Sequence, residues 1–187
     1  MDIDSQGYKE KLYKQISDAY GKVVYTYTTQ LYQAGIDAEF SKCLKKVQIG
    51  LSAATSAGFF TTIMTGWSCL NWINALVSTA LLGLSAYITS TDLDTKVQRH
   101  IQTANRLWLV REKYIALLTD LQNLDNHQII EERDKLTNEV AEIYAVAPLT
   151  SGDAYCKART ALKENEEQFF SQEELYKMLP AHLRKRT

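Results

Sequence analysis

The sequence predicts an all-α protein in which a hairpin of two transmembrane helices stands beside a bundle of long amphipathic helices. Three observations predict this class. Apolar residues repeat every three or four positions on both sides of the middle of the chain. Only two prolines, Pro148 and Pro180, occur among 187 residues, so long helices are possible. Residues 47–91 contain no Asp, Glu, Lys, Arg or His, although 23% of the chain is charged.

The first segment, residues 1–46, is predicted to be an amphipathic helix that leads into the membrane. Apolar side chains from Tyr8 to Leu31 repeat at helical spacing over about 28 residues. Gly35 is expected to end this helix, because glycine is common just after helix C-termini. The tyrosines of this stretch are expected to pack in a core with their hydroxyls reaching water, rather than to stack nucleotides.

The second segment, residues 47–91, is predicted to be the transmembrane hairpin. Random placement of the charged residues would leave such a gap with a probability on the order of 10⁻⁵. A charge at the centre of a spanning helix costs about 2.5–3.5 kcal/mol, which accounts for the gap. Val47 to Thr65 forms one span, residues 66–72 a turn, and Trp72 to Ser90 the second span. About 20 helical residues reach across roughly 30 Å of hydrocarbon.

The residues that flank the spans predict the orientation of the hairpin. Trp67 and Trp72 suit the membrane interface. Lysines and an arginine flank the two spans on the side away from the turn, which carries no charge: Lys42, Lys45, Lys46, Lys96 and Arg99. The positive-inside rule therefore places both termini in the cytoplasm. The alternative is an apolar hairpin buried in a soluble bundle, because the spans are rich in Ser, Thr, Ala and Gly.

Polar side chains recur at helical intervals along both spans and form what we call the polar stripe. Its members are Gln48, Ser52, Thr55 and Thr62 in the first span and Asn74, Ser78, Ser85 and Thr89 in the second. Small and polar residues let membrane helices pack closely and bond across their interface. The other interpretation is that the stripe lines a water-filled path. One hairpin cannot enclose such a path, so this interpretation requires an oligomer.

The third segment, residues 92–187, is predicted to be helical. Val97 to Leu121 carries a near-heptad apolar pattern that could run straight out of the second span. Four charged residues on it form a candidate binding cluster, for which a solvated helix face is the default interpretation: Arg106, Arg111, Glu112 and Lys113. A turn at 123–126 precedes a helix from Ile129 to Tyr144, which ends before Pro148.

The end of the chain is expected to hold two shorter helices. One covers residues 153–168, and the other covers 175–179 and stops before Pro180. Ser171 and Glu174 have the spacing of a capping box. The basic residues 184–186 could contact anionic headgroups, form a frayed tail or act as a docking peptide.

Catalytic, cofactor-binding and metal-binding signals are missing from the sequence. There is no phosphate-binding glycine motif, zinc-protease motif or nucleophile elbow. The histidines lie far apart, and His100 is expected to be a structural hydrogen-bonder. The isolated Cys43, Cys69 and Cys156 are expected to be reduced, structural thiols. With a net charge of −1, direct sequence-specific nucleic-acid binding is not expected. We therefore expect no enzyme activity, no cofactor and no metal.

The order of features resembles the SLATT superfamily of two-transmembrane effectors. The resemblance rests on the small-residue stretches 52–58 and 82–87 in the hairpin and on "ANRLWLVREKYIALLTDL" at 104–121. The tail "SQEELYKMLPAHLRKR" at 171–186 resembles the C-terminal element of the branch that accompanies reverse transcriptases. The resemblance implies an effector of bacterial anti-phage defence that oligomerises and permeabilises the inner membrane when triggered, causing abortive infection. It implies a sensor, a reverse-transcriptase- or nucleotidyltransferase-type partner, or a nucleotide product of that partner as the trigger.

Two hypotheses of function follow. In the first, the chain is the membrane-permeabilising effector that the resemblance implies. In the second, it is a membrane-anchored helical scaffold that forms no pore and recruits a soluble partner. The residue pattern alone indicates only a membrane-anchored helical oligomer.

Overall fold

The computed structural model describes residues 2–65 and 68–184, except for the side chains of residues 2–5, 62, 65, 68–70 and 181. Within these ranges the chain is helical and contains no strand, which confirms the all-α class. Six α-helices and one 3₁₀ turn follow one another: α1 Asp2–Thr65, α2 Ser68–Thr91, α3 Leu93–Asp120, α4 Asn126–Val146, α5 Gly152–Lys163, α6 Gln172–Met178 and η1 Ala181–Leu183.

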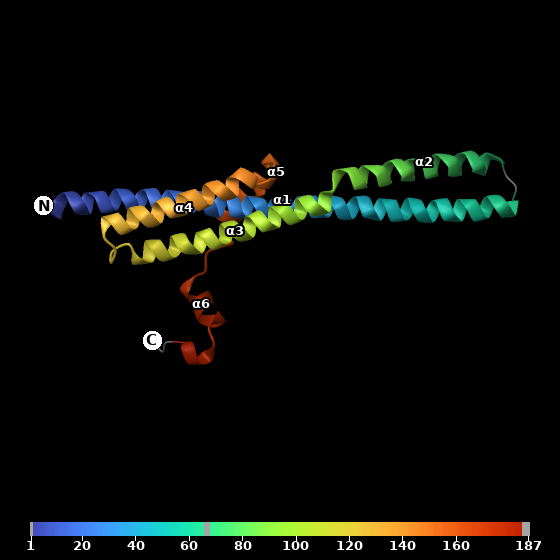
Figure 1. Ribbon diagram of the computed structural model, residues 1–187. Helices are drawn as coiled ribbons and strands as arrows, with labels where there is room; N and C mark the ends of the chain where they lie inside the picture. Colours follow the sequence, from blue (N-terminus) through green and yellow to red (C-terminus); the bar gives the residue numbers. More distant parts are fainter. Residues whose placement is uncertain (1, 66–67, 185–187) are drawn as a thin grey trace.

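Helix α1 runs the length of the molecule (Figure 1). Its 64 residues correspond to about 96 Å at 1.5 Å per residue. The prediction that a helix ends at Gly35 is wrong, because this glycine lies in the middle of α1. Glycine inside a helix costs only about 1 kcal/mol. The neighbouring Ala34 and Ser41 are buried against the rest of the fold, and this packing outweighs that cost.

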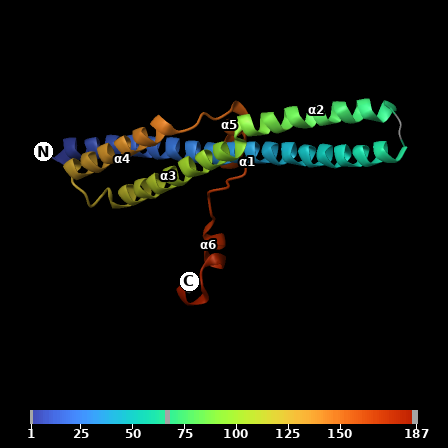
Figure 2. The same ribbon diagram turned by 45° about the vertical axis from the view of Figure 1, so that its right-hand side comes forward.

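The C-terminal part of α1 and the whole of α2 lie side by side and form a hairpin (Figures 1 and 2). The expected turn at 66–72 is too long, because α2 already begins at Ser68. Residues 68–72 include no proline or glycine, so nothing in them opposes the helix. Trp67, the first of the two predicted interface tryptophans, lies outside the described residues.

Helices α2 and α3 are two elements rather than one continuous helix. The backbone of Asp92 between them adopts the left-handed conformation, with φ 43° and ψ 50°. Aspartate tolerates this conformation better than most residues. The prediction that the apolar pattern of residues 97–121 could continue straight out of the second span is therefore wrong. Since both helices run back along α1, the break allows α2 and α3 to follow different faces of it (Figures 1 and 2).

The bundle consists of residues 2–46 of α1 together with α3, α4 and α5. Its apolar core joins three helices and the turn after α3: Leu12, Ile16 and Val23 from α1; Leu107, Val110, Tyr114, Leu117 and Leu121 from α3 and its end; Ile129, Leu136 and Ile143 from α4. Helix α5 packs on α1 through small residues at one-turn spacing, Ala154, Ala158 and Ala161. Small side chains let the two backbones approach closely.

Helices α4 and α6 each begin at a residue whose side chain caps the helix. Asp125 caps α4 in a capping box with Gln128, and Ser171 caps α6 in the predicted box with Glu174. Helix α5 ends at Lys163, short of the expected 168. The chain turns there, and Glu166 has a φ of 51°. Helix α6 contains no buried residue and stands away from the bundle (Figures 1 and 2).

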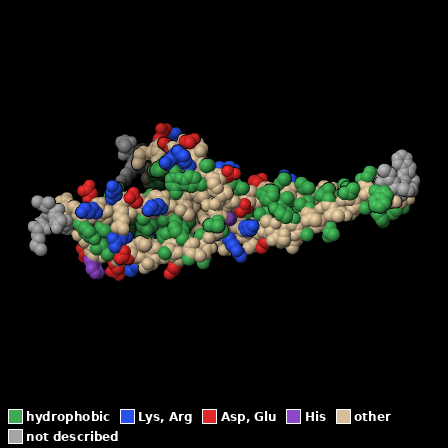
Figure 3. Space-filling view, turned by 90° about the horizontal axis from the view of Figure 1, so that it is seen from above, with side chains coloured by type: hydrophobic (Ala, Val, Ile, Leu, Met, Phe, Trp, Pro, Cys, Tyr) green, Lys and Arg blue, Asp and Glu red, His purple; other side chains and the backbone are tan. Residues whose placement is uncertain are grey.

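Charged side chains are segregated along the molecule. On the face shown in Figure 3 the Lys, Arg, Asp and Glu side chains are scattered over the bundle among apolar and uncharged ones, and the far half of the hairpin shows only apolar and uncharged side chains. Among the described residues, one helical stretch, Asn71–Asp120, contains a segment long and apolar enough to cross a membrane. None of that segment is buried inside the chain.

Candidate functional site: the hairpin and its junction with the bundle

The two limbs of the hairpin, residues 47–65 of α1 and the whole of α2, face each other along one side. The residues on this side are half-buried at helical spacing: Gln48, Leu51, Thr55 and Gly58 on the first limb, and Asn74, Val77, Ser78, Leu81, Leu84, Ser85 and Ile88 on the second. Polar and apolar side chains alternate along this interface. The limbs therefore meet through a mixed surface rather than a purely apolar one.

Two contacts between the limbs involve members of the polar stripe. The Gln48 side-chain amide donates a hydrogen bond to the Ser85 hydroxyl across 3.0 Å. Nearer the tip, the Asn74 side chain packs over Gly58, where an added Cβ would lie 3.0 Å from the Asn74 Oδ1. A Cβ at position 58 would require the Asn74 side chain to move by a few tenths of an ångström. The glycine thus lets a polar side chain fit between two closely spaced helices.

The remaining members of the stripe divide between the inside and the outside of the hairpin. Thr55 and Ser78 are half-buried between the limbs, whereas Ser52 and Thr89 are exposed. The hydroxyls of Thr55, Ser52 and Thr89 donate to carbonyls one turn earlier in their own helices, at 2.9, 2.9 and 3.0 Å. This back-bonding satisfies the hydroxyl without a partner on another helix. The side chain of Thr62 lies outside the described part.

The outer surface of the hairpin is strongly apolar. Its large exposed side chains are Val47, Ile49, Phe59, Phe60, Ile63, Met64, Trp72, Ile73, Leu76, Leu82 and Tyr87. Trp72, the predicted interface anchor, is 78% exposed near the start of α2. So much exposed apolar surface on one element is typical of a segment that contacts lipid or other copies.

An ion pair joins the two ends of the hairpin where it meets the bundle. The Asp94 carboxylate lies 2.6 Å from the Lys45 ammonium and accepts a hydrogen bond of 2.8 Å from the Ser41 hydroxyl. The hydrogen bonds from Lys45 and Ser41 hold the pKa of Asp94 below its usual value. The sequence analysis did not predict this ion pair. It could have been predicted because Asp94 follows the charge-free segment closely and, in a hairpin, can face Lys45 just before that segment.

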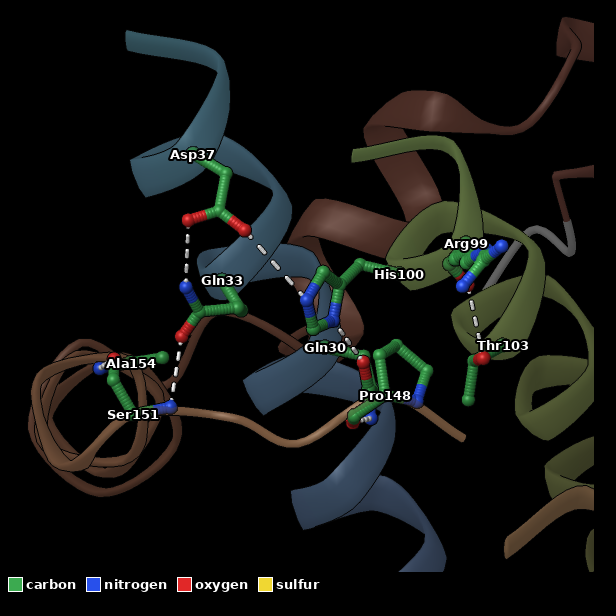
Figure 4. Close-up of polar contacts among 9 residues, drawn as sticks. All are labelled: Gln30, Gln33, Asp37, Arg99, His100, Thr103, Pro148, Ser151 and Ala154. Carbon is green, nitrogen blue, oxygen red and sulfur yellow. Dashed lines mark hydrogen bonds and ion pairs between the residues drawn. The ribbon is translucent and has the colours of Figure 1, made fainter. Parts of the chain in front are cut away.

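A buried polar layer lies in the bundle beside this junction (Figure 4). His100 of α3 is 3% exposed, and its Nδ1 lies 2.5 Å from the Gln30 Oε1 of α1. Its Nε2 lies 3.6 Å from an Asp37 carboxylate oxygen. Burial lowers the pKa of His100, whereas the Asp37 carboxylate acts in the opposite direction. His100 is therefore the structural hydrogen-bonder that the sequence predicted.

The same layer holds the segment between α4 and α5. Gln30 donates to the Pro148 carbonyl at 3.2 Å. Gln33 donates to Asp37 at 2.9 Å and accepts from the backbone N–H of Ser151 at 2.8 Å. Side chains of α1 thus bond to α3 on one side and to the α4–α5 segment on the other (Figure 4).

The candidate charged cluster on α3 does not converge on a single site. Arg111 is mostly buried and pairs with the neighbouring Glu112, while Lys113 pairs with Glu139 of α4 at 2.7 Å. Cys43 and Cys156 are free thiols, as the sequence predicted, but both are exposed and neither has a structural role in the core. Across the described ranges, no group of three or more His, Cys, Asp and Glu side chains could hold a metal ion.

Comparison with known proteins identifies one family. A family model described as SMODS and SLOG-associating 2TM effector domain family 4 matches residues 12–174. The match includes both limbs of the hairpin, the junction and the buried polar layer, and it ends in the first turn of α6. No curated protein and no solved structure shows significant similarity to the chain.

Proposed function

The chain belongs to family 4 of the SMODS and SLOG-associating two-transmembrane (SLATT) effector domains, and from this premise we propose that it permeabilises the inner membrane of a bacterium when a partner signals infection. The family is one of effector domains and is not a known enzyme family. We accordingly assign the chain no catalytic step and no cofactor.

In this proposal both limbs span the inner membrane and both termini are cytoplasmic. The charge-free segment, the apolar outer surface of the hairpin and the basic residues on the bundle side support this topology. It divides the chain into a cytoplasmic lead-in at 1–46, a transmembrane hairpin at 47–91 and a cytoplasmic region at 92–187. Since α1 crosses the first of these boundaries without a break, the bundle and the first limb share one helix.

The observation that carries the proposal is the uncharged but polar interface between the limbs. Gln48, Asn74 and Ser85 are held between the limbs, while Ser52 and Thr89 are exposed. A hairpin held in lipid by apolar contacts alone would not need these groups. When several copies associate and the limbs separate, the same side chains can hydrogen-bond water in a shared path.

A trigger must bind one arrangement of the bundle better than the other, because a ligand of equal affinity for both shifts nothing. A sensor protein, a reverse-transcriptase- or nucleotidyltransferase-type partner, or the nucleotide product of that partner could supply this difference. The Asp94–Lys45 pair lies where such a change would pass from α3 into the hairpin.

The test replaces hydroxyl residues of the stripe with leucine. Variant one carries Ser52→Leu, Thr55→Leu, Ser78→Leu and Ser85→Leu. Its matched control carries the same number of leucines at exposed hydroxyl positions outside the stripe: Ser56, Thr61, Thr79 and Ser90. Membrane potential and entry of an impermeant dye are followed during infection in bacteria that carry the neighbouring genes. We expect the stripe variant to lose most of its dye entry and the control to keep it.

Two results would contradict the proposal. One is undiminished dye entry by the stripe variant at an equal amount of membrane-bound protein. The other is a membrane potential that never changes when the unmodified chain is activated.

The second candidate function is a membrane-anchored scaffold without a pore. The Gln48–Ser85 bond and the packing of Asn74 on Gly58 favour it, since they account for part of the stripe within a single closed hairpin. In that case the unmodified chain would protect cells without any entry of the impermeant dye. A soluble partner would also bind the bundle in detergent without any change in membrane potential.

A further inference from the structure

A cleft lies between the first half of α1 and α5, and its volume is about 480 Å³. The residues that carry the argument below come from both helices: Gly21, Lys22 and Tyr25 from α1, and Tyr155 and Lys163 from α5. Small-molecule sites in proteins commonly measure about 300–1,000 Å³. The cleft therefore has the size of a ligand site, and a ligand in it would contact two helices of the bundle.

Two tyrosine rings form the aromatic part of the cleft. The centroids of the Tyr25 and Tyr155 rings are 6.0 Å apart and their planes differ by 27°, so the rings stack. Tyr25 differs in this from Tyr20 and Tyr27 of the same helix, which pack against the apolar core. Tyr155 is 52% exposed. Its exposed part offers a surface on which a further planar ring can stack.

Two ammonium groups make the cleft positive. Lys22 of α1 and Lys163 of α5 line it together with one carboxylate, that of Asp18. Neither lysine forms an ion pair with a described residue. The Lys163 Nζ lies 6.0 Å from the centroid of the Tyr25 ring, so charge and aromatic surface are adjacent. An anion bound here is attracted from both helices.

Gly21 keeps the α1 side of the cleft open. It lies one helical turn before Tyr25 and next to Lys22. A Cβ built on this glycine would meet no atom within 4 Å. A long side chain at this position would therefore project into the cleft and take the place of a ligand.

These groups identify the chemical class of the ligand. A positive cleft beside a stacking surface suits a molecule that joins a phosphate to a planar ring, and a nucleotide has this combination. Thr26, the lining residue of α1 nearest the hairpin, precedes Lys46 by 20 residues, which is about 30 Å along the helix. In the proposed topology the phosphates of lipid headgroups are therefore out of reach.

From these observations we infer that the cleft between α1 and α5 binds a nucleotide, with its phosphates at Lys22 and Lys163 and its base on Tyr155. The ligand contacts α1 and α5 as they pack beside a closed hairpin, so it favours this arrangement over one in which α5 leaves α1. This consequence rests on the proposed function, whereas binding does not. A bound nucleotide restrains the hairpin, and a trigger acts against that restraint.

The first experiment measures binding to the purified full chain in detergent by isothermal titration calorimetry. The probes are ATP, GTP, inorganic pyrophosphate and adenosine. We expect ATP or GTP to bind about tenfold more tightly than pyrophosphate, because stacking of the base adds to the charge contacts. Adenosine, which has no phosphate, should bind less tightly than the nucleotides. A single-stranded oligothymidylate tests the other source of the same chemistry and should bind no more tightly than ATP.

Two pairs of variants separate the charge contacts from stacking. Lys22→Gln with Lys163→Gln should weaken the binding of both ATP and pyrophosphate about tenfold. The control, Lys11→Gln with Lys157→Gln, removes two exposed lysines from the same two helices outside the cleft and should change neither.

The tyrosine pair gives the opposite pattern. Tyr155→Ala should weaken ATP binding about tenfold and leave pyrophosphate binding unchanged, because only ATP has a base that stacks. Tyr13→Ala is the control. Tyr13 is also 52% exposed but lies outside the cleft, and its loss should affect neither probe.

Gly21→Leu fills the cleft without a change of charge. Leucine is a better helix former than glycine, so the variant is expected to fold, and circular dichroism checks this. It should abolish ATP binding and, through loss of the restraint, raise dye entry in uninfected cells. Gly35→Leu is the matched control on the same helix. A Cβ there also meets no atom within 4 Å, and the variant should bind ATP and exclude dye like the unmodified chain.

The nucleotide site is overturned if no nucleotide binds more tightly than pyrophosphate, if the oligothymidylate binds more tightly than ATP, or if ATP binding survives Gly21→Leu. A Gly21→Leu chain that binds no ATP and admits no more dye than the unmodified chain contradicts the restraint. The leak assay also keeps the two proposals apart. Dye entry during infection by an unmodified chain that binds no nucleotide removes the cleft and leaves the proposed function standing. ATP binding by a chain that never permits dye entry does the reverse.

Discussion

His100 is a buried group whose surroundings act on its pKa in opposite directions. Burial disfavours the charged ring, and the Asp37 carboxylate at 3.6 Å favours it. The net effect lowers the pKa below 6.5. A depressed histidine pKa means that the unfolded chain takes up a proton near pH 6.5 while the folded chain resists it.

We therefore expect the bundle to lose stability as the pH falls from about 7.5 to 5.5. Thermal unfolding of the full chain in detergent, followed by circular dichroism, measures this. His100→Gln keeps a hydrogen-bonding side chain and should flatten the pH dependence in this window, where carboxylates contribute little because they titrate lower. A free energy of unfolding that rises toward pH 5.5 would show instead that the Asp37 carboxylate raises the pKa of His100 more than burial lowers it.

Some residue contacts could be predicted from the sequence and others could not. The capping box of Ser171 and Glu174 depends on a spacing of three residues, so the sequence alone predicts it. The Gln48–Ser85 bond joins residues 37 positions apart and depends on how far the limbs are offset. That offset is set by where α2 begins, and no local rule specifies it.

At the scale of elements, α1 shows how packing overrides a local signal. Gly35 has the sequence context of a helix end, yet buried side chains on both sides of it hold the helix together. Asp92 shows the reverse case. It has no glycine or proline beside it, and yet the helix is interrupted there. On either side of it α2 and α3 lie along different faces of α1 (Figures 1 and 2).

Gly35→Ala should raise the free energy of unfolding by about 0.4–1 kcal/mol. The position is helical, and an added Cβ meets no atom within 4 Å. Denaturant unfolding of the purified chain in detergent tests this. Gly58→Ala is the matched control, because its Cβ would lie 3.0 Å from the Asn74 side chain and should bring no such gain. An equal gain at both positions would contradict the packing described for the hairpin.

At the scale of the whole molecule, the all-α class was predicted correctly. The charge-free residues 47–91 lie in the hairpin at one end of an elongated structure, and on the face shown in Figure 3 the charged side chains lie on the rest of the molecule. The sequence predicted that a short helix forms after Ser171, but it did not predict that α6 stands away from the bundle. A local pattern of residues shows that a helix forms and does not show where it lies.

The two exposed cysteines offer a direct test of topology. In a Cys69→Ser background, Cys43 and Cys156 should react with a membrane-impermeant maleimide in inverted vesicles and stay unreactive in intact spheroplasts, because the bundle faces the cytoplasm in our proposal. Residue 72 lies near the tip of the hairpin. In a chain without other cysteines, Trp72→Cys should therefore react in intact spheroplasts and stay unreactive in inverted vesicles. Labelling of Cys43 and Cys156 from outside would reverse the proposed orientation.

The continuity of α1 also sets an order of events during synthesis. Its first half is made before any other element, yet Leu12 and Ile16 pack against Leu107 and Ile129, which emerge from the ribosome about a hundred residues later. Both limbs of the hairpin lie in that interval. In the proposed two-pass topology, the nascent chain therefore presents both limbs to the insertion machinery before the bundle has closed. The apolar side of α1 stays exposed until the last core helix has been made.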